Sequence, residues 1–252
     1  MPFPHLKDGF TALVIGAGSG IGAGLVRKLL YDPQCATVHA ASRSATDSTE
    51  LPDDERLYRH ELDVTSESRF RELAANLQET GQSLDLIIYA VGVLHDDEGL
   101  EPEKKLADIQ LANLLKSFSA NTFGAMLAAR HFSELMPASE GSVFAAISAR
   151  VGSISDNRLG GWYAYRASKA ALNQFLKTLS VEFSRRRKRA VVLSLHPGTT
   201  DTQLSAPFQA GVPEGKLFSV DYSCECLLKN IAAARPDDSG SFIAWDGKRI
   251  EW

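Results

Sequence analysis

Cysteine is scarce in this chain, and histidine is scattered. The three cysteines among 252 residues, Cys35, Cys224 and Cys226, are odd in number and form no CxxC pair, which argues against a disulfide framework and a zinc site. The six histidines include no HExxH motif, so we expect no metal centre. This cysteine usage suits a reducing compartment, and we expect a cytoplasmic protein.

The chain also lacks a large net charge and long apolar runs. The formal net charge of −4 predicts no general attraction to nucleic acid or to membrane surfaces. The longest apolar run, residues 84–94, is too short to cross a bilayer and contains Asp85. The first ten residues have no apolar signal core, so we expect no targeting leader. The remaining composition, 44% hydrophobic and 23% charged, is typical of a globular protein with a sizeable core.

Two kinds of apolar segment alternate along the chain. Short runs rich in Val, Ile, Leu and Ala predict strands at 11–15, 36–41, 57–62, 84–90, 141–147, 190–195 and 241–245. Helical spacing predicts a first helix from Ile21 to Leu30 and a second that begins after Thr65 or Ser66. It also predicts a long helical region between the loop 95–105 and about Met136, a helix around Tyr165, and a last helix over 220–234. The alternation predicts a single α/β domain over residues 1–252, a Rossmann fold with a doubly wound parallel sheet of about seven strands.

A glycine-rich turn follows the first predicted strand and opens the first predicted helix. Its sequence is GAGSGIG, residues 16–22. Strand, glycine turn and helix in this order can bind a pyrophosphate, because the backbone approaches closely and helix N–H groups point at the anion. The candidate cofactor-binding residues are Gly16, Gly18, Ser19, Gly20, Ile21 and Gly22. A tight turn without a ligand is the alternative.

The end of the second predicted strand bears on which dinucleotide binds. An acidic residue about 20 residues beyond the glycine turn is typical of NAD sites, where it binds the ribose 2′-OH. Here the strand ends in Ser42 and Arg43. Without the carboxylate a 2′-phosphate is not repelled, and a guanidinium can bind it in bidentate fashion. We therefore expect NADP(H) in preference to NAD(H); an ordinary surface arginine is the alternative.

The carboxyl ends of the other predicted strands carry further candidates, because ligands bind beyond these ends in open parallel sheets. These candidates are Ala90, Gly92, Ser148, Pro197, Gly198, Thr200 and Thr202. The hydroxyls that follow the Pro-Gly turn can bond a carboxamide. Segment 199–219, rich in Pro, Gly and Phe, is a predicted flap over the site. The irregular loop 95–105 is predicted to shape the same pocket.

Tyr165 and Lys169 are four residues apart on a predicted helix, so their side chains share one face. Of the six tyrosines, only Tyr165 has a lysine four residues on. An ammonium beside a phenol favours the phenolate and lowers the tyrosine pKa, which suits proton transfer near neutral pH. An amphipathic helix with both residues on its solvated side is the alternative.

Two other polar features are open to two interpretations. Asn121 lies inside a predicted helical region, where an amide favours a bent or bulged turn. From the residues alone it is an ordinary polar position. The basic run 185–189 ends the Tyr165 helix. A nucleic-acid patch is one interpretation; we expect a solvated helix end whose cations suit the negative end of the dipole.

Taken in order, these motifs resemble those of the short-chain dehydrogenase/reductase family. They are the GAGSGIG turn, Asp63, Asn121, Ser148, Tyr165-xxx-Lys169 and Pro197-Gly198. The resemblance covers essentially the whole chain. The segments SARVGSISDNRLGGWYAYRASKAALN, HPGTTDT and FIAWDGKRIEW are most similar to the C-factor/sniffer-like carbonyl reductase subgroup. The chain departs from the family pattern at Ile15, usually Thr, and at 89–92, where Tyr-Ala-Val-Gly replaces Asn-Asn-Ala-Gly.

The resemblance implies a role for each of four catalytic candidates. Tyr165 would be the general acid in carbonyl reduction and the base in alcohol oxidation. Lys169 would lower the pKa of Tyr165 and hold the ribose hydroxyls next to the nicotinamide. Ser148 would bind the carbonyl oxygen. Asn121 would support a water path from Lys169 to solvent.

The resemblance also implies a function. It is the NADP(H)-dependent reduction of a small aldehyde or ketone to an alcohol, with Asp63 and Val64 flanking the adenine and Arg43 facing the 2′-phosphate. One alternative is a nucleotide-binding sensor or signalling protein of the C-factor type. Another is an NAD-dependent alcohol dehydrogenase. We expect a homodimer or homotetramer with no nucleic-acid or membrane partner.

Overall fold

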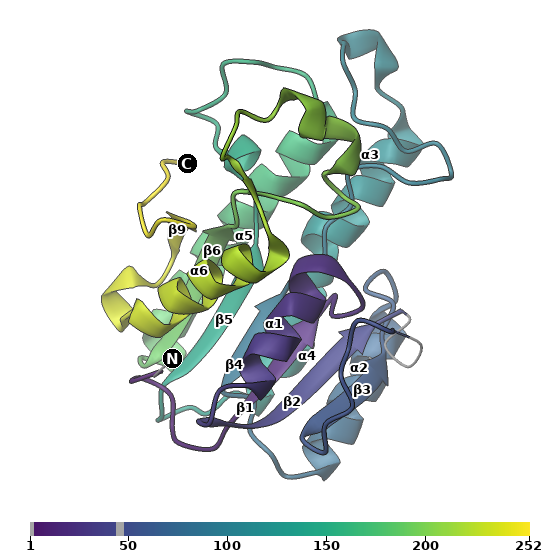
Figure 1. The fold of residues 1–252 in the computed structure, drawn as a ribbon. Coiled ribbons are helices and arrows are strands. Elements are labelled where there is room, and N and C mark those ends of the chain that lie inside the picture. The colour runs from purple at the N-terminus through teal and green to yellow at the C-terminus, as the bar shows by residue number, and fades with distance from the viewer. Residues whose placement is uncertain (1–2, 44–47) are drawn as a thin grey trace.

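A sheet of seven parallel strands forms the centre of the computed structural model, which describes residues 3–43 and 48–252 (Figure 1). In spatial order the strands are β3 (Leu57–Glu61), β2 (Cys35–Ser42), β1 (Phe10–Ile15), β4 (Leu86–Tyr89), β5 (Ser142–Ile147), β6 (Ala190–His196) and β9 (Ser241–Ala244). Every pairing between neighbours in this sheet is parallel. The predicted doubly wound sheet of about seven strands is confirmed.

The strand order changes direction between β1 and β4. β2 and β3 follow on one side of β1, and β4, β5, β6 and β9 follow on the other. In sheets of this kind, ligands bind at such a switch point, beyond the carboxyl ends of the strands. The glycine turn follows β1 and the loop that starts at Ala90 follows β4, so both candidate segments emerge at this point.

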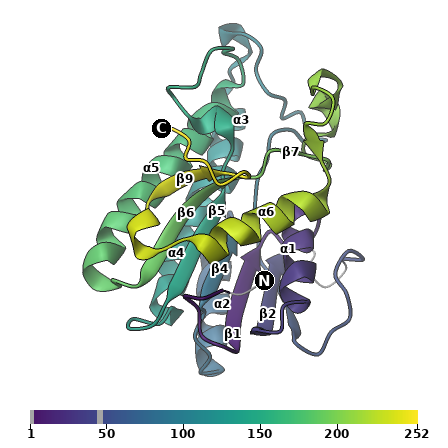
Figure 2. The same cartoon turned by 60° about the vertical axis from the view of Figure 1, so that its left-hand side comes forward.

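Helices cover both faces of the sheet. α1 (Gly20–Leu30) and α6 (Val220–Ala233) lie on one face, whereas α2 (Glu67–Glu79), α4 (Gly124–Phe132) and α5 (Tyr163–Arg186) lie on the other (Figures 1 and 2). α3 (Leu111–Phe118) precedes α4 and contacts α5. α5 is the longest helix and carries the Tyr165–Lys169 pair along one side of the sheet.

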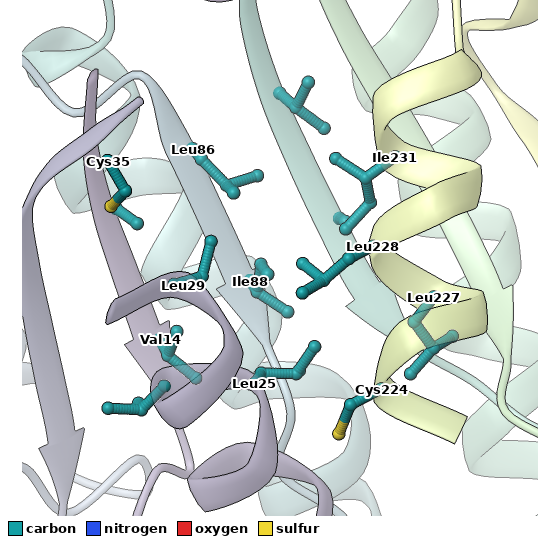
Figure 3. Packing of buried hydrophobic residues seen from close by; sticks show 14 of the residues in the cluster. Val14, Leu25, Leu29, Cys35, Leu86, Ile88, Cys224, Leu227, Leu228 and Ile231 are labelled. Atoms are coloured by element: carbon teal, nitrogen blue, oxygen red, sulfur yellow. The ribbon is translucent and has the colours of Figure 1, made fainter. Parts of the chain in front are cut away.

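Neighbouring residues of β1 belong to different apolar cores. Val14 joins the cluster beneath α1 and α6, and Leu13 joins the cluster beneath α2, α4 and α5. Figure 3 shows the first cluster, in which Leu25 of α1 and Leu228 of α6 both reach over the strands. Burial on both faces is typical of parallel strands. It anchors the strands, so the loops at their carboxyl ends start from fixed points.

The predicted long helical region up to Met136 is interrupted. It consists of a 3₁₀ turn (Leu106–Asp108), α3, a π-helical turn (Ser119–Phe123), α4 and a second 3₁₀ turn (Ser133–Leu135). The bulged turn that Asn121 favours is therefore present. The Asn121 amide in this turn bonds the backbone of Val93, outside the helix.

The predicted flap, segment 199–219, contains regular secondary structure. β7 (Thr199–Thr200) pairs in parallel with β8 (Leu217–Phe218), and a 3₁₀ helix (Ala206–Gly211) lies between them. In both views this green segment extends beyond the same end of the sheet as α3 and the start of α5 (Figures 1 and 2). The flap therefore lies on the side where the candidate site residues emerge.

Candidate active site

The glycine turn between β1 and α1 has room for no side chain at two of its positions. Gly16 has φ +88°, and a Cβ there would lie 2.8 Å from Cγ2 of Val91. A Cβ on Gly22 would lie 2.0 Å from the carbonyl oxygen of Gly16. Glycine at both positions brings the turn against the loop after β4 and keeps the helix start close to the strand. This is the geometry that lets a backbone approach a pyrophosphate.

The N-terminus of α1 already binds an anionic group. The N–H of Gly20 donates a hydrogen bond to Oε2 of Glu50, 3.2 Å away. Arg27 donates to the carbonyl oxygen of Glu50 at 2.8 Å, and the Ser48 hydroxyl donates to the carbonyl oxygen of Gly18 at 2.7 Å. Ser48 and Glu50 thus lie beside the glycine turn and the start of α1. Reasoning from the sequence missed Glu50, because no local pattern pairs it with the turn.

The end of β2 holds a polar group without a partner. The Ser42 hydroxyl is buried and has no hydrogen-bond partner within residues 3–43 and 48–252. Arg43 follows it and is exposed. Asp63, after β3, accepts from the N–H and the hydroxyl of Thr65 at 2.9 and 2.7 Å. The Thr65 N–H, and to a smaller extent the hydroxyl and Arg43, hold the pKa of Asp63 below its usual value. Val64 is buried beside it.

Tyr165 and Lys169 are both buried in the first turns of α5, with exposed fractions of 8% and 2%. The Lys169 Nζ lies 5.8 Å from the centre of the Tyr165 ring and donates a hydrogen bond to the carbonyl oxygen of Ile147 at 2.9 Å. A Cβ on Gly152 would lie 2.8 Å from Cβ of Lys169. Close packing therefore holds the lysine between α5 and the end of β5. The alternative of a solvated Tyr–Lys face is wrong.

The pKa values of this pair differ from the sequence-based expectation. Burial lowers the pKa of Lys169 to about 7. Burial raises the pKa of Tyr165, so the expected lowering by the neighbouring ammonium is not found. The reason is that both groups leave water together, and Lys169 points at a backbone carbonyl oxygen. In this state the phenol keeps its proton.

Ser148 directly follows the residue that binds Lys169. Its N–H donates to the carbonyl oxygen of Leu195 at 2.7 Å, which fixes its backbone at the end of β5. Its hydroxyl is buried and has no partner in the part of the chain that the structure describes. Unpaired buried hydroxyls are uncommon because they lose hydrogen bonds to water. A hydroxyl in this condition is suited to bind a ligand atom.

Asn121 ties the π-helical turn to the loop after β4. Its Oδ1 accepts from the N–H of Val93 at 2.7 Å, and its Nδ2 donates to the carbonyl oxygen of Val93 and the hydroxyl of Ser168, at 2.9 and 3.0 Å. A Cβ on Gly92 would lie 3.7 Å from Nζ of Lys169 and 3.9 Å from Oδ1 of Asn121. The two predicted catalytic residues Asn121 and Lys169 therefore meet at Gly92.

The two candidate threonines after β6 lie in different surroundings. Gly198 has φ +78° and lies against the Phe218 ring, where no Cβ fits. The Thr200 hydroxyl is buried and bonds the Ser223 hydroxyl of α6 at 2.7 Å. Thr202 instead lies beside the glycine turn, since a Cβ on Gly20 would be 3.3 Å from its Cγ2. Of the two, Thr202 is the threonine that reaches the candidate phosphate site.

Aromatic rings connect Tyr165 to the two loops that were predicted to shape the pocket. The Trp162 ring packs edge-on to Tyr165 at 6.2 Å and to Phe208 of the flap at 5.0 Å. His95 packs edge-on to Phe208 at 5.8 Å, and its Nε2 lies 3.1 Å from the carbonyl oxygen of Gln203. The flap and loop 95–105 thus meet next to Tyr165.

Comparison with known proteins agrees with this geometry. Residues 10–212 match the family model described as short chain dehydrogenase. The chain belongs to the short-chain dehydrogenase family. This is an oxidoreductase family, and the residues that were predicted from the family motifs lie at its usual ligand-binding end of the sheet.

Two curated relatives of this short-chain dehydrogenase cover different shares of it. The 1-hydroxy-2-glutathionyl-2-methyl-3-butene dehydrogenase of Rhodococcus sp. (strain AD45) is 30% identical over 96% of the chain and 99% of its own length. The C-signal protein of Myxococcus xanthus is 32% identical over 58% of the chain and 83% of its own length.

Solved structures of similar proteins superpose over nearly the whole short-chain dehydrogenase fold. The carbonyl reductase Sniffer of D. melanogaster has a TM-score of 0.82 at 25% identity, covering 98% of this chain and 100% of that one. The NADPH-bound carbonyl reductase from chicken fatty liver has a TM-score of 0.84 at 25% identity, covering 99% and 96%. The predicted family, with its C-factor/sniffer-like subgroup, is confirmed.

The structure explains one departure from the family pattern, Tyr89. Tyr89, which stands where the family usually has Asn, is fully buried, and its hydroxyl donates to the carbonyl oxygen of Ala120 at 2.5 Å. Tyr89 therefore supports the π-helical turn that carries Asn121. The sequence alone did not predict this contact, because the partner lies in another element.

Two other sequence features are accounted for by this short-chain dehydrogenase fold. Within the basic run 185–189 at the end of α5, Arg187 is buried and bonds the carbonyl oxygen of Met136 at 2.7 Å and Glu134 at 3.1 Å. Part of the run is thus structural. No helix within residues 3–43 and 48–252 is both long enough and apolar enough to span a membrane.

Proposed function

We propose that this short-chain dehydrogenase is an NADP(H)-dependent reductase of small aldehydes or ketones. The observation that carries the proposal is the junction of β5 and α5. There a buried Lys169 bonds the carbonyl oxygen of Ile147, the adjacent Ser148 hydroxyl lacks a partner among the described residues, and Tyr165 is buried one helical turn before Lys169. All three side chains can exchange or donate protons, and all three are buried.

The residues around the glycine turn fit a dinucleotide. Positions Gly16 and Gly22 exclude side chains, and Gly20 offers its N–H to the Glu50 carboxylate, which stands in for an anionic phosphate oxygen. The unpaired Ser42 hydroxyl and the exposed Arg43 support a 2′-phosphate contact in preference to a ribose diol. When bound, the nicotinamide supplies the hydride.

In the proposed reaction, the side chains of this chain manage the proton and the charge. The Tyr165 phenol gives its proton to the substrate oxygen as the carbonyl carbon takes up the hydride. The Ser148 hydroxyl donates a hydrogen bond to the same oxygen and stabilises its developing negative charge. Lys169 stabilises the resulting phenolate. Asn121, held on the Val93 backbone, supports the return of a proton from solvent.

Substitution of the phenol tests the mechanism. Tyr165→Phe should lower kcat by roughly 10²- to 10⁴-fold, the usual contribution of a general acid, with the Kd for NADPH little changed. Tyr163→Phe is the matched control, because Tyr163 lies on the same helix and is exposed. Near-normal turnover by Tyr165→Phe on a panel of aldehydes and diketones would show that the mechanism is wrong.

A sensor or signalling role is the second candidate, and the similarity to C-signal favours it. Such a protein would bind the nucleotide without turning over a substrate. Tight binding of NADPH together with no oxidation of NADPH across a broad carbonyl panel would support this role against the reductase.

The nucleotide preference distinguishes the third candidate, an NAD-dependent alcohol dehydrogenase. If Arg43 binds the 2′-phosphate, Arg43→Ala should raise the KM for NADPH and leave that for NADH nearly unchanged. Arg59→Ala, on β3, is a control that removes a cation bonded to the backbone of the preceding loop. An unchanged ratio of the two KM values would remove the basis of the NADP(H) proposal.

We also propose that the chain forms a homodimer or homotetramer in the cytoplasm. Apolar side chains stay exposed along α3, α4 and α5 and in the turn between α3 and α4; they are Leu111, Leu115, Phe123, Met126 and Val181. The cysteines are free, which agrees with a reducing compartment. Light scattering after gel filtration should give a multiple of the 27.4 kDa chain mass. A monomer at all concentrations would contradict the assembly.

A further inference from the structure

A buried carboxylate caps the helix that carries Tyr165. Glu103 lies in the loop between β4 and α3 and is 3% exposed. Its Oε2 accepts a hydrogen bond from the N–H of Ala164 at 3.1 Å, across 61 positions of sequence. Its Oε1 is also buried and has no hydrogen-bond partner among the described residues. Burial of a carboxylate is costly unless it serves an interaction, and here the interaction is with the first turn of α5.

The backbone of Glu103 holds the residue that precedes the helix. Its carbonyl oxygen accepts from the N–H of Trp162 at 2.6 Å. Trp162 is left-handed, with φ 53° and ψ 45°, and is the one non-glycine residue with positive φ in the described chain. This conformation is strained for a bulky residue and persists only where surrounding contacts hold it. Glu103 provides such a contact.

The local sequence explains why α5 needs a cap from another segment. The N-cap position is Trp162, whose side chain accepts no hydrogen bond from the helix. The preceding Gly160 and Gly161 both have φ +65° and offer no side chain. The first N–H groups of a helix need acceptors, and a negative charge there suits the dipole. Glu103 performs the task that Ser or Asp performs at an ordinary N-cap.

We propose that Glu103 is a positioning residue for Tyr165. By capping α5 and holding Trp162 in its left-handed conformation, it sets where the phenol lies. Tyr165 directly follows the capped Ala164, and its ring packs on Trp162 at 6.2 Å. A misplacement of about 1 Å can cost 10²-fold in rate. The inference rests on the proposed role of Tyr165 as proton donor. Cofactor binding should be unaffected, because the glycine turn joins β1 to α1 and not to α5.

Four variants test this role. Glu103→Ala removes the acceptor, Glu103→Asp withdraws the carboxylate by one methylene, and Glu103→Gln keeps an oxygen acceptor. Glu101→Ala is the matched control, because Glu101 is an exposed carboxylate in the same loop. For each variant we would measure kcat and KM for a carbonyl substrate, the Kd for NADPH, and the amide hydrogen exchange of Trp162 and Ala164.

The expected result separates the cap from a general loss of stability. Glu103→Ala should lower kcat by roughly 10- to 100-fold and speed amide exchange at Ala164 by roughly 5- to 10-fold, with the Kd for NADPH within about twofold of wild type. Glu103→Asp should shift the same quantities less. Glu103→Gln should restore most of both, and Glu101→Ala should change neither.

Several outcomes would overturn the inference. One is unchanged amide exchange at Ala164 in both Glu103→Ala and Glu103→Asp. Another is faster exchange in these variants with a wild-type kcat, and a third is a fall in kcat without faster exchange. If Glu103→Ala does not fold, Glu103→Asp decides. If the wild type reduces no carbonyl compound, the proposed function fails separately. The near-ultraviolet circular dichroism of the Trp162–Tyr165 pair must then weaken in Glu103→Asp for the positioning role to stand.

Discussion

The N–H of Gly20 donates a hydrogen bond to the carboxylate of Glu50, so an acidic side chain occupies the N-terminal end of α1. A helix N-terminus after a glycine turn attracts anions. A phosphate group at this helix end would compete with Glu50 for the same N–H.

Removal of this charge should tighten nucleotide binding. We expect Glu50→Gln to lower the Kd for NADPH by roughly 2- to 5-fold, since one charge at a helix end is worth at most about 1 kcal/mol at an exposed site. Fluorescence titration of NADPH would measure it. Glu55→Gln, an exposed carboxylate in the same connection, is the control. Equal affinities for Glu50→Gln and wild type would show that the contact does not oppose the cofactor.

Because Lys169 is buried, the free energy of unfolding should increase as the pH rises above 7. Its pKa falls to about 7 in the folded chain, while the unfolded chain binds the proton up to about pH 10.4. Between these values the unfolded state holds more protons, so the free energy of unfolding should rise with pH by up to about 1.4 kcal/mol per unit. Urea unfolding of wild type and Lys169→Met at pH 7, 8 and 9 would check this. A constant difference between them would contradict it.

A pair of imidazoles between β2 and β3, with His39 buried and His60 half-buried, should weaken the fold in acid. His39 Nδ1 lies 2.9 Å from His60 Nε2. Burial, and then the His39 charge, lower the pKa of His60 to about 4, and burial lowers that of His39. The unfolded chain binds these protons below about pH 6.5, so stability should be lost as the pH falls from about 6.5 to 4.

Replacement of one imidazole tests the acid sensitivity. His60→Leu should remove roughly 1 to 3 kcal/mol of the stability loss between pH 7 and 4. His131→Gln is a control, because His131 bonds the exposed carboxylate of Glu67 on α2. Thermal unfolding across this pH range would measure the effect. If His60→Leu and wild type lose stability in parallel, the pair is not the cause.

The flap residue Phe208 should act on substrate binding. Its ring packs on Trp162, next to Tyr165. An edge-on aromatic contact is worth about 0.5 to 1.5 kcal/mol. We therefore expect Phe208→Ala to raise KM for aryl ketones roughly 2- to 10-fold, and less for short aliphatic aldehydes. Steady-state kinetics with both classes would show this, with the exposed Pro207→Ala as control. Equal changes for both classes would exclude an aromatic contact with the substrate.

Local patterns predicted much of the fold because the deciding interactions are local or repeat along the chain. Runs such as Phe10–Ile15 are buried on both faces, which leaves a continuous apolar signal. The turn before α1 was predictable since glycine alone fits at Gly16 and Gly22. The bulge at Asn121 followed from the preference of an amide for backbone partners.

Other features depend on atoms far apart in the sequence. Tyr165 and Lys169 were predicted as a pair from their spacing alone. The direction of the Tyr165 pKa was not, because burial and the carbonyl oxygen of Ile147 come from other elements. Glu50, Glu103 and Tyr89 act on the glycine turn, on α5 and on the bulge through contacts between segments. Nothing in the neighbouring sequence marks Glu50 or Glu103.

The sequence by itself determined the order of strands and helices, the glycine turn and the helical spacing of Tyr165 and Lys169, since each depends on residues within one or two turns of the chain. Tertiary structure alone decided the protonation of that pair, the cap on α5 and the carboxylate at the start of α1. Desolvation and hydrogen bonding between distant segments exist only once the sheet has brought those segments together.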